Sequence, residues 1–310
     1  MTGELQYIRK CDLIVSNETG DALNLAGLTI NFAIKKTDGQ TPNTAAIRVY
    51  NLNEDTQSRI KKEFTRVTLQ AGYESNYGVI FDGNVKQYTD GRENVVDHFL
   101  DIQAADGDES YNFAVVNATL AAGAKQRDQI AAAAKTMQQL GGTDLGYVGD
   151  ETDGEALPRG KVMYGMARDY IRNSAQSSAS SWSIQNGKIQ VVPLTGILPG
   201  QAVVLNSQSG LVNAPEQTND GIKFRCLLNP QLVIGGMVQI NERDIIQAKL
   251  DDNPSQDGQK KEPAQIQHDG FYRLITATIA GNTRGNDWYI DGVCLSIDQT
   301  APVGKKVQGQ

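Results

Sequence analysis

Cysteine and histidine are scarce in this chain, and each shortage argues against a class of function. The three cysteines, Cys11, Cys226 and Cys294, are odd in number and far apart, so neither a disulfide framework nor a zinc site with paired spacing is expected. Only two histidines are present, His98 and His268, and no serine stands in a G-x-S-x-G turn. The sequence therefore does not predict an enzyme that uses a nucleophilic side chain.

Long apolar runs and nucleotide-binding loops are missing as well. No 18-residue apolar stretch and no charged-then-apolar leader is present near the N-terminus, so we expect a chain made and kept in a cytosol, without a membrane partner. The pairs Gly141-Gly142 and Gly235-Gly236 are not followed by the Lys and Ser or Thr of a phosphate-binding loop, and turn or cap roles explain both. The formal charge of −7 argues against a surface built to neutralise phosphates; a passage that lets DNA slide would also benefit from it, but plain solubility is the better explanation.

The composition that is present describes an ordinary folded protein rich in turns. The 310 residues are 39% hydrophobic and 21% charged, and 31 glycines accompany an aromatic content of only 6%. This length allows two or three packed units, and the many turn residues favour β structure.

Residues 1–107 are predicted to form a small antiparallel barrel or sandwich. The stretch 28–50 contains two runs of alternating apolar residues joined by the polar loop 37–43, the pattern of a half-buried hairpin. Asn53 is a candidate N-cap for a short helix that buries Ile60 and Phe64. Further alternating runs predict the remaining strands, at residues 7–15, 67–72, 79–88 and 98–104.

Residues 108–205 are predicted to form an inserted α+β unit. Strong helix formers at 127–140 end on Gly141-Gly142, and a second helix is predicted over 158–175, with Pro158 in its first turn. The pair Asn186-Gly187 lies between two short alternating runs, which is the strongest hairpin signal in the chain because this pair suits a type I′ turn.

Residues 206–310 are predicted to form a second antiparallel barrel. Its expected strands lie at residues 221–228, 237–245, 270–281 and 287–297. The polar segment 251–269 is expected to be a mobile loop, because it has almost no apolar anchor. The fold class is therefore mainly β, with two tube-like barrels flanking a middle α+β domain.

No catalytic, cofactor-binding or metal-binding residue is predicted. The acidic loop 150–155 has enough oxygen atoms for a calcium ion, but its spacing does not match a twelve-residue calcium loop, so a solvated turn is the better interpretation. Asp106, Asp108 and Glu109 are weaker candidates still. Trp182 and Trp288 stand in alternating strands, where a core role is more common than ligand stacking.

Several stretches, in this order along the chain, resemble the baseplate hub proteins of contractile-tailed bacteriophages. The similarity includes FAIKKTDGQTPNTAAIRVYNLNEDT and GFYRLITATIAGNTRGNDWYIDGVCLSI. The matching segments are residues 32–56, 69–75, 79–85, 181–230 and 270–297.

The resemblance implies two tube-type barrels in one polypeptide and a trimeric ring of three such chains. Such a ring would join a six-fold tail tube to a three-fold central spike, contact the tape-measure protein and other baseplate subunits, and let DNA pass without specific binding. No cofactor and no enzymatic activity is implied, and the expected location is the virion tail. Related contractile injection machines, such as a tailocin or a secretion spike, and a cell-wall hydrolase are the alternative interpretations.

Two expectations concern surfaces of this ring. The loop 37–43 is expected to contact a neighbouring subunit or the tube, and the net negative charge predicts a lumen that repels phosphates. Lumen or interface candidates among the charged strand residues are Asp82, Lys86, Glu242 and Asp244.

Overall fold

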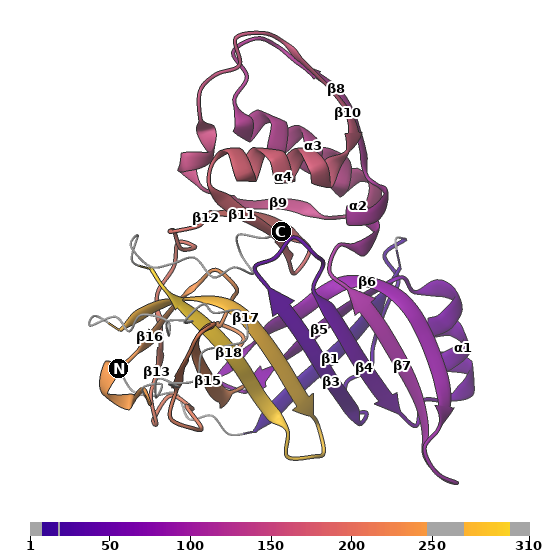
Figure 1. The fold of residues 1–310 in the computed structure, drawn as a ribbon. Helices are drawn as coiled ribbons and strands as arrows, with labels where there is room; N and C mark the ends of the chain where they lie inside the picture. Colours follow the sequence, from indigo (N-terminus) through magenta and orange to yellow (C-terminus); the bar gives the residue numbers. More distant parts are fainter. Residues whose placement is uncertain (1–7, 18, 247–269, 298–310) are drawn as a thin grey trace, which may run out of the picture.

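The computed structural model of the chain describes residues 8–17, 19–246 and 270–297. Thirteen of the strands form one sheet, and a smaller α+β region stands at one end of it (Figure 1). The predicted loop 251–269 lies outside the described residues.

The first β region alternates as its sequence pattern predicts. Its strands are β1 (Arg9–Ser16), β2 (Ala22–Asn24), β3 (Ile30–Thr37), β4 (Thr44–Tyr50), β5 (Arg66–Tyr73), β6 (Asn76–Arg92) and β7 (His98–Ala105). Helix α1 (Glu54–Glu63) begins after Asn53, whose side chain accepts a hydrogen bond from the Asp55 amide, so the predicted N-cap is confirmed. Ile60 and Phe64 are buried against the sheet.

The second β region contains the four predicted strand regions and two short strands that its sequence did not indicate. Its strands are β13 (Val203–Leu205), β14 (Glu216–Thr218), β15 (Gly221–Leu227), β16 (Met237–Ile240), β17 (Phe271–Asn282) and β18 (Trp288–Ser296). The strand predicted over 237–245 ends at Ile240 and is followed by a short 3-10 helix, η2 (Glu242–Asp244).

The two β regions share one sheet and one apolar core. Strand β17 pairs with β3 in antiparallel register, with Ala280 opposite Ala33, and the yellow β17 and β18 run beside indigo β3 in Figure 1. A single cluster of buried side chains includes both Phe32 and Trp288, whose rings meet edge to face at 5.6 Å. The mainly β class is therefore confirmed, but the described strands form one continuous sheet, and their pairing closes no barrel.

The middle region has its own core. It contains α2 (Asp108–Phe113), β8 (Val115–Leu120), α3 (Gln126–Gly141), β9 (Asp144–Val148), η1 (Asp150–Asp153), β10 (Lys161–Met166), α4 (Ala167–Ser177), β11 (Ser180–Gln185) and β12 (Lys188–Pro193). Helices α3 and α4 pack on the small sheet β11-β12-β9, and a separate ribbon pairs β8 with β10. Ile130, Met137, Ile171 and Trp182 are buried between these layers.

The helix predicted over 158–175 is wrong in its first half. Residues Lys161–Met166 are strand β10, paired with β8, and helix α4 begins only at Ala167. Met163 is buried while Val162 and Tyr164 on either side are exposed, which is strand alternation. The local spacing of apolar residues resembled a helical face, because it does not show that Lys161–Met166 pair with the distant β8.

Two turn predictions are confirmed. Helix α3 ends on Gly142 in the left-handed region, with φ of 66°. Asn186 and Gly187 both have positive φ, 52° and 75°, as a type I′ turn between β11 and β12 requires.

Candidate functional site

The side of the large sheet away from the apolar core is polar and open to solvent. We call it the bare face, and its side chains are exposed or half-buried. Cross-strand register places three rows on it, namely Leu227, Tyr289, Ala280, Ala33, Ala46, Gln103 and Gln87; Arg225, Asp291, Thr278, Lys35 and Thr44; and Asn282, Asn31, Arg48, Asp101 and Thr89. Short alanine, threonine and amide side chains dominate these rows.

Most of the charge on the bare face is paired across strands. Arg48 Nε donates to Asp101 Oδ1 at 2.7 Å and Nη2 to Oδ2 at 2.9 Å. Arg225 makes the same bidentate contact with Asp291, since its Nε donates to Oδ1 at 2.6 Å and its Nη2 to Oδ2 at 2.9 Å. Lys35 is the one other charged residue in the three rows. These three rows are therefore close to neutral.

The two Arg–Asp pairs occupy equivalent places in a repeated unit of four strands. The sheet order reads β14-β15-β18-β17 and then β3-β4-β7-β6, so β15 and β18 correspond to β4 and β7. Arg225 lies over the Tyr289 ring as Arg48 lies over the Phe99 ring. The ladders β17–β18 and β6–β7 each carry an irregularity at the matching position, before Thr276 and before Gln87. The chain thus contains one structural unit twice.

A buried ion pair ties the second β region to the loop 37–43 and to the middle region. The Arg273 side chain is 4% exposed, and its guanidinium contacts the equally buried Asp38 carboxylate and donates to Ser181 Oγ at 3.0 Å. It also donates to the Pro193 carbonyl at 2.6 Å. Burial raises the pKa of Asp38, and the neighbouring Arg273 opposes that rise.

A second buried cluster holds the β11–β12 turn against the sheet. The Asp106 carboxylate accepts hydrogen bonds from the amides of Asn186 and Gly187, the latter at 2.7 Å. Lys36 Nζ donates to Asn186 Oδ1 at 2.7 Å, and Asn43 Nδ2 donates to the Ile184 carbonyl at 2.8 Å. Burial raises the pKa of Asp106 to about 6 and lowers that of Lys36 to about 8. Together with Arg273–Asp38, we call these contacts the polar junction.

The polar junction changes the interpretation of several predicted surface positions. Asp38 and Asn43 of the loop 37–43 are buried in it against the chain's own middle region, whereas Thr41 is exposed. Asp82 is paired with Arg66 at 2.7 Å beside this junction, and Lys86 with Asp108 at 3.3 Å.

The remaining two candidates lie elsewhere. Asp244 is exposed in η2, far along the chain from the junction, and Glu242 belongs to the same short helix. Asp244 lines an open groove of about 530 Å³ with Asn206, Val212 and Ile246. None of the four candidates belongs to the three rows of the bare face.

The acidic loop 150–155 contains carboxylates that are held by ion pairs. Residues Asp150–Asp153 form η1, where Asp153 contacts Lys125 Nζ at 3.1 Å and Arg127 Nε at 2.9 Å. The Lys125 ammonium lowers the pKa of the Asp153 carboxyl. Across the described residues, no group of three His, Cys, Asp or Glu side chains is arranged to hold a metal ion.

The tryptophans and two of the cysteines are core residues, as expected. Trp182 and Trp288 are buried, and so are Cys226 and Cys294. Burial raises the pKa of Cys226 to about 12, so its thiol stays protonated at neutral pH. These residues stabilise the fold and contact no open site.

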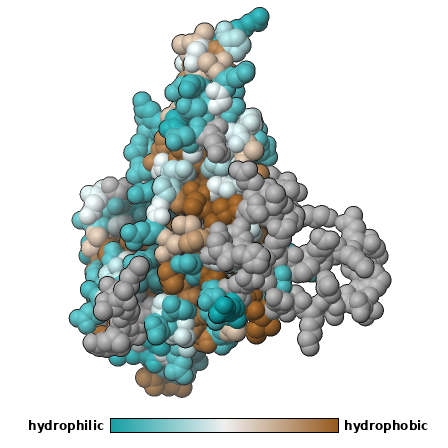
Figure 2. All heavy atoms as spheres, turned by 90° about the vertical axis from the view of Figure 1, so that its left-hand side faces the viewer, coloured by the Kyte–Doolittle hydropathy of each residue, from teal (hydrophilic) through white to brown (hydrophobic). Residues whose placement is uncertain are grey.

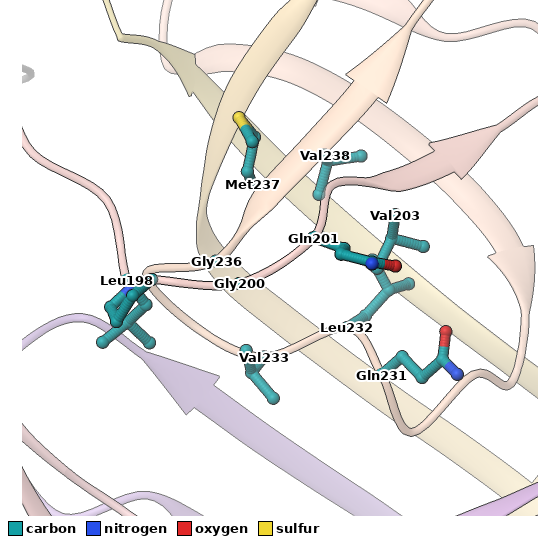
Figure 3. A pocket seen from close by; sticks show the side chains of 11 residues that line it. Leu198, Gly200, Gln201, Val203, Gln231, Leu232, Val233, Gly236, Met237 and Val238 are labelled. Atoms are coloured by element: carbon teal, nitrogen blue, oxygen red, sulfur yellow. The ribbon is translucent and has the colours of Figure 1, made fainter.

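The apolar hollow in Figure 3 is too small to bind a substrate. Its volume is about 50 Å³, and Leu232, Val233, Met237 and Val238 contribute to its lining, whereas ligand pockets measure roughly 300–1,000 Å³. Figure 2 shows apolar side chains gathered on the side of the molecule that lies to the left in Figure 1, and Val204 and Val233 are among the exposed apolar residues of the second β region. A protein contact suits such a surface better than a small ligand does.

Two hairpin tips project from the end of the sheet opposite the middle region (Figure 1). In the β6–β7 tip, Val95 and Val96 are 91% and 76% exposed. Asn94 and Asp97 hold this tip, since Asn94 Oδ1 accepts from the Val96 and Asp97 amides at 2.8 Å each. The apolar pair is thus presented on an ordered turn.

Sequence reasoning missed the Arg–Asp pairs and the polar junction. One signal could have located the pairs, because Asp97-His-Phe-Leu-Asp101 and Asp287-Trp-Tyr-Ile-Asp291 are two copies of one pattern. No local signal marks Arg273, whose partners come from three separate parts of the chain.

This fold is shared with phage tail proteins of known structure. The 43 kDa tail protein of prophage MuSo2 from Shewanella oneidensis matches with a TM-score of 0.57 at 8% identity, covering 94% of this chain and 99% of that one. A tail protein from Neisseria meningitidis matches with a TM-score of 0.58 at 8% identity, covering 94% and 97%. A Francisella PdpA-VgrG complex in its half-lidded form matches at 0.50 and 8% identity, covering 96% of this chain and 59% of that one.

The chain belongs to the baseplate hub gp41 family, whose model matches residues 11–244. It is thus a member of a family of structural proteins of the bacteriophage tail baseplate. No curated protein matches it. Within the described part of the chain, none of the helices has the length and apolarity needed to cross a membrane.

Proposed function

We propose that this chain is a non-enzymatic virion protein that forms a trimeric hub at the end of the tail tube. The hub joins the six-fold tube to the three-fold central spike and surrounds the DNA passage during genome ejection. Its units are residues 1–107 and 206–310, each in the place of one tube-type barrel, and the middle domain 108–205. It is assembled in the host cytoplasm, and its partners are the tube, spike and tape-measure proteins and other baseplate subunits.

The repeated four-strand unit is the observation that carries this proposal. A chain that contains the unit twice presents six equivalent units when three copies close into a ring. Such a ring can match a six-fold tube through its repeated units. The single middle region of each chain occurs only three times, which suits a three-fold spike.

The near-neutral bare face supports a passage that DNA crosses without being held. Phosphate contacts from Lys and Arg supply most non-specific DNA affinity. Because Arg48 and Arg225 are each bound by an aspartate, few free cations remain in the three rows.

Copy number in purified tails tests the hub. We expect each tail to contain half as many copies of this chain as one ring of the tube contains tube subunits. Mass spectrometry against isotope-labelled peptides of both proteins measures the two copy numbers. A monomer in solution is compatible with this result if rings close only on the tube. Equal copy numbers would contradict the trimeric hub, because the chain would then match the tube one to one.

A related contractile injection machine is a second candidate, and the fold shared with a Francisella PdpA-VgrG complex favours it. The two functions differ in whether the particle carries a genome. Purified particles that contain this chain are expected to hold nuclease-protected DNA if it is a phage hub. Particles without DNA, encoded beside tube genes but no capsid genes, would favour the injection machine.

A further inference from the structure

Lys36 of the polar junction is a buried lysine whose amino group contacts a side-chain amide. It lies in β3, is 8% exposed, and its Nζ donates to Asn186 Oδ1 at 2.7 Å. No carboxylate in the described part of the chain forms an ion pair with it, although buried lysines are usually paired. Burial lowers its pKa to about 8, so more of this amine is neutral, and therefore nucleophilic, than of a surface lysine.

Asn186 presents its side-chain carbonyl carbon to this amine. A carbonyl bond is ~1.23 Å long, so Nζ lies within about 3.9 Å of Asn186 Cγ. Reacting atoms held ready for attack are roughly 3–3.5 Å apart, so a small side-chain rotation brings the two atoms into range. The β11–β12 turn holds Asn186 in place, since the Asp106 carboxylate accepts hydrogen bonds from both amides of the turn.

Asp106 is the acid–base group that a reaction between these two side chains needs. It is hydrogen-bonded to the backbone of Asn186, and its charge acts on that of Lys36. Burial raises its pKa to about 6, so its carboxylate can accept and release a proton near neutral pH. The amine, the amide and the carboxyl group thus meet in one enclosed cluster.

The usual competing reaction of an Asn-Gly pair is hindered in this turn. In a flexible chain the glycine nitrogen attacks the asparagine Cγ and closes a cyclic imide. Here the Gly187 nitrogen donates instead to Asp106 Oδ1 at 2.7 Å, inside an ordered hairpin. Lys36 Nζ is therefore the nucleophile better placed to reach Asn186 Cγ.

We propose that Lys36 and Asn186 join in a self-catalysed isopeptide bond, with Asp106 carrying the protons. The Nζ lone pair forms a bond to Cγ, and the Cγ–Nδ2 bond breaks with its electron pair on Nδ2. Asp106 takes a proton from the Lys36 ammonium group and gives it to Nδ2, which leaves as ammonia. A second Nζ proton ends on this ammonia. One ammonium group is thus replaced by one ammonium ion, and no oxidant or further reactant is needed.

The bond fastens the first β region to the middle region. Its two residues are 150 positions apart, so it closes a long loop and restricts the unfolded chain as a disulfide does. All three cysteines of the chain are free, and this bond needs no oxidising compartment. The middle region then cannot be pulled off the large sheet without breaking a covalent bond. The inference goes beyond the proposed hub and does not depend on it.

The mass of the purified full-length wild type tests the bond directly. Loss of ammonia on attack by the lysine lowers the mass by about 17 Da. Trypsin should release a branched peptide in which residues 36–48 are joined to residues 173–188, because a linked Lys36 is not cleaved. A wild type with its full sequence mass and a free peptide 37–48 would overturn the proposal. The same mass loss without the branched peptide would indicate a cyclic imide and overturn it too.

Three single variants assign the two reacting side chains. Lys36→Met removes the nucleophile, and Asn186→Gly removes the electrophile while keeping the positive φ of the turn. Both should retain their full mass. Lys35→Met changes the exposed neighbour on the bare face and is the matched control, which should still lose ammonia. Mass loss in Lys36→Met equal to that of wild type would overturn the assignment.

Asp106→Asn tests the proton transfer. Wild type should be linked when it is purified, whereas Asp106→Asn should link about 100-fold more slowly or less. The branched fraction of the folded protein, followed over days at neutral pH, measures this. A merely structural role for Asp106 would change the melting temperature and leave that fraction unchanged. Equal linkage in the two proteins would therefore reject Asp106 as the proton carrier.

Discussion

Arg273 joins three parts of the chain through one buried side chain. It contacts Asp38 of the first β region and Ser181 and Pro193 of the middle region, while standing in β17 of the second. A buried charge pair contributes little net stability, but removing one partner leaves the other charge buried alone. The function of this pair is therefore to fix how the three regions meet.

Arg273→Met is expected to lower the free energy of unfolding by about 3–5 kcal/mol, because Asp38 then stays buried without its counter-charge. Adding Asp38→Leu should recover most of the loss. The exposed pair offers a matched control, and Arg225→Met should cost about 1 kcal/mol or less. Urea unfolding of the four proteins measures this, and equal losses for Arg273→Met and Arg225→Met would contradict the assigned role.

Asp106 gives the junction a pH dependence. Its pKa is raised from 3.8 to about 6, chiefly by burial, so between these values the native state binds a proton that the unfolded state releases. Its contribution to the free energy of unfolding is therefore greatest below pH 3.8 and falls as the pH rises to about 6. Asp106→Asn lacks this titration.

The melting temperature of wild type, relative to that of Asp106→Asn, is expected to decrease between pH 4 and 6 and then level off. Thermal melts at several pH values measure the difference, in which the other titrating groups largely cancel. Parallel melting curves for the two proteins would show that Asp106 does not titrate in this window.

Among the elements, those with a local cause could be predicted from the sequence. The N-cap Asn53, the C-cap Gly142 and the turn Asn186-Gly187 each depend on a few neighbouring residues, and all are confirmed. The helix predicted over 158–175 was half wrong because β10 depends on pairing with β8, which lies outside the local sequence. Strands β13 and β14 were missed for the same reason, since three residues carry no period.

The β11–β12 turn is expected to be sensitive at Gly187. Gly187→Ala adds a Cβ at φ of 75° and 3.1 Å from Arg66 Nη2, so it combines backbone strain with a close contact. Gly123→Ala adds the same strain at φ of 89° in open space. Each should cost about 1–2 kcal/mol, and Gly187→Ala more than its control. If denaturant unfolding gives the same loss of unfolding free energy for both variants, the Arg66 side chain moves away from the new Cβ at no cost.

The β6–β7 tip is expected to matter for assembly and not for folding. Val95→Ser with Val96→Ser removes apolar area that is already exposed, so the free energy of unfolding should change by about 0.5 kcal/mol or less. Tail yield in complementation should fall if the tip docks on a partner. The matching substitution Asn286→Ser in the β17–β18 tip is the control, and normal tails from the valine variant would remove the tip from the contact surface.

At the scale of the whole molecule, the continuous sheet could not be predicted from the sequence. Each β region shows its own alternation, but the β17–β3 joint links strands far apart along the chain, and nothing local specifies which edges meet. Two separate barrels were therefore the natural expectation. The repeated pattern at 97–101 and 287–291 marks Asp101 and Asp291 in the sequence, but only the register shows that Arg48 and Arg225 are their partners.

If the bare face lines the DNA passage, breaking its two Arg–Asp pairs should slow the passage of DNA. Asp101→Asn with Asp291→Asn frees Arg48 and Arg225 on the bare face, and the freed guanidinium groups of every copy can contact phosphates. Genome ejection should slow several-fold at about 50 mM salt and recover at about 200 mM, because each phosphate contact weakens with salt.

Two further variants separate charge from structure in that experiment. Asp169→Asn releases Arg172 on α4, a similar surface pair on the middle region, and should leave ejection unchanged. Adding Arg48→Gln and Arg225→Gln to the aspartate variant removes the freed charge and should restore the rate. If this fourfold variant stays slow, the loss lies in the sheet and not in the charge; if the aspartate variant ejects at the wild-type rate in low salt, the bare face does not line the DNA path.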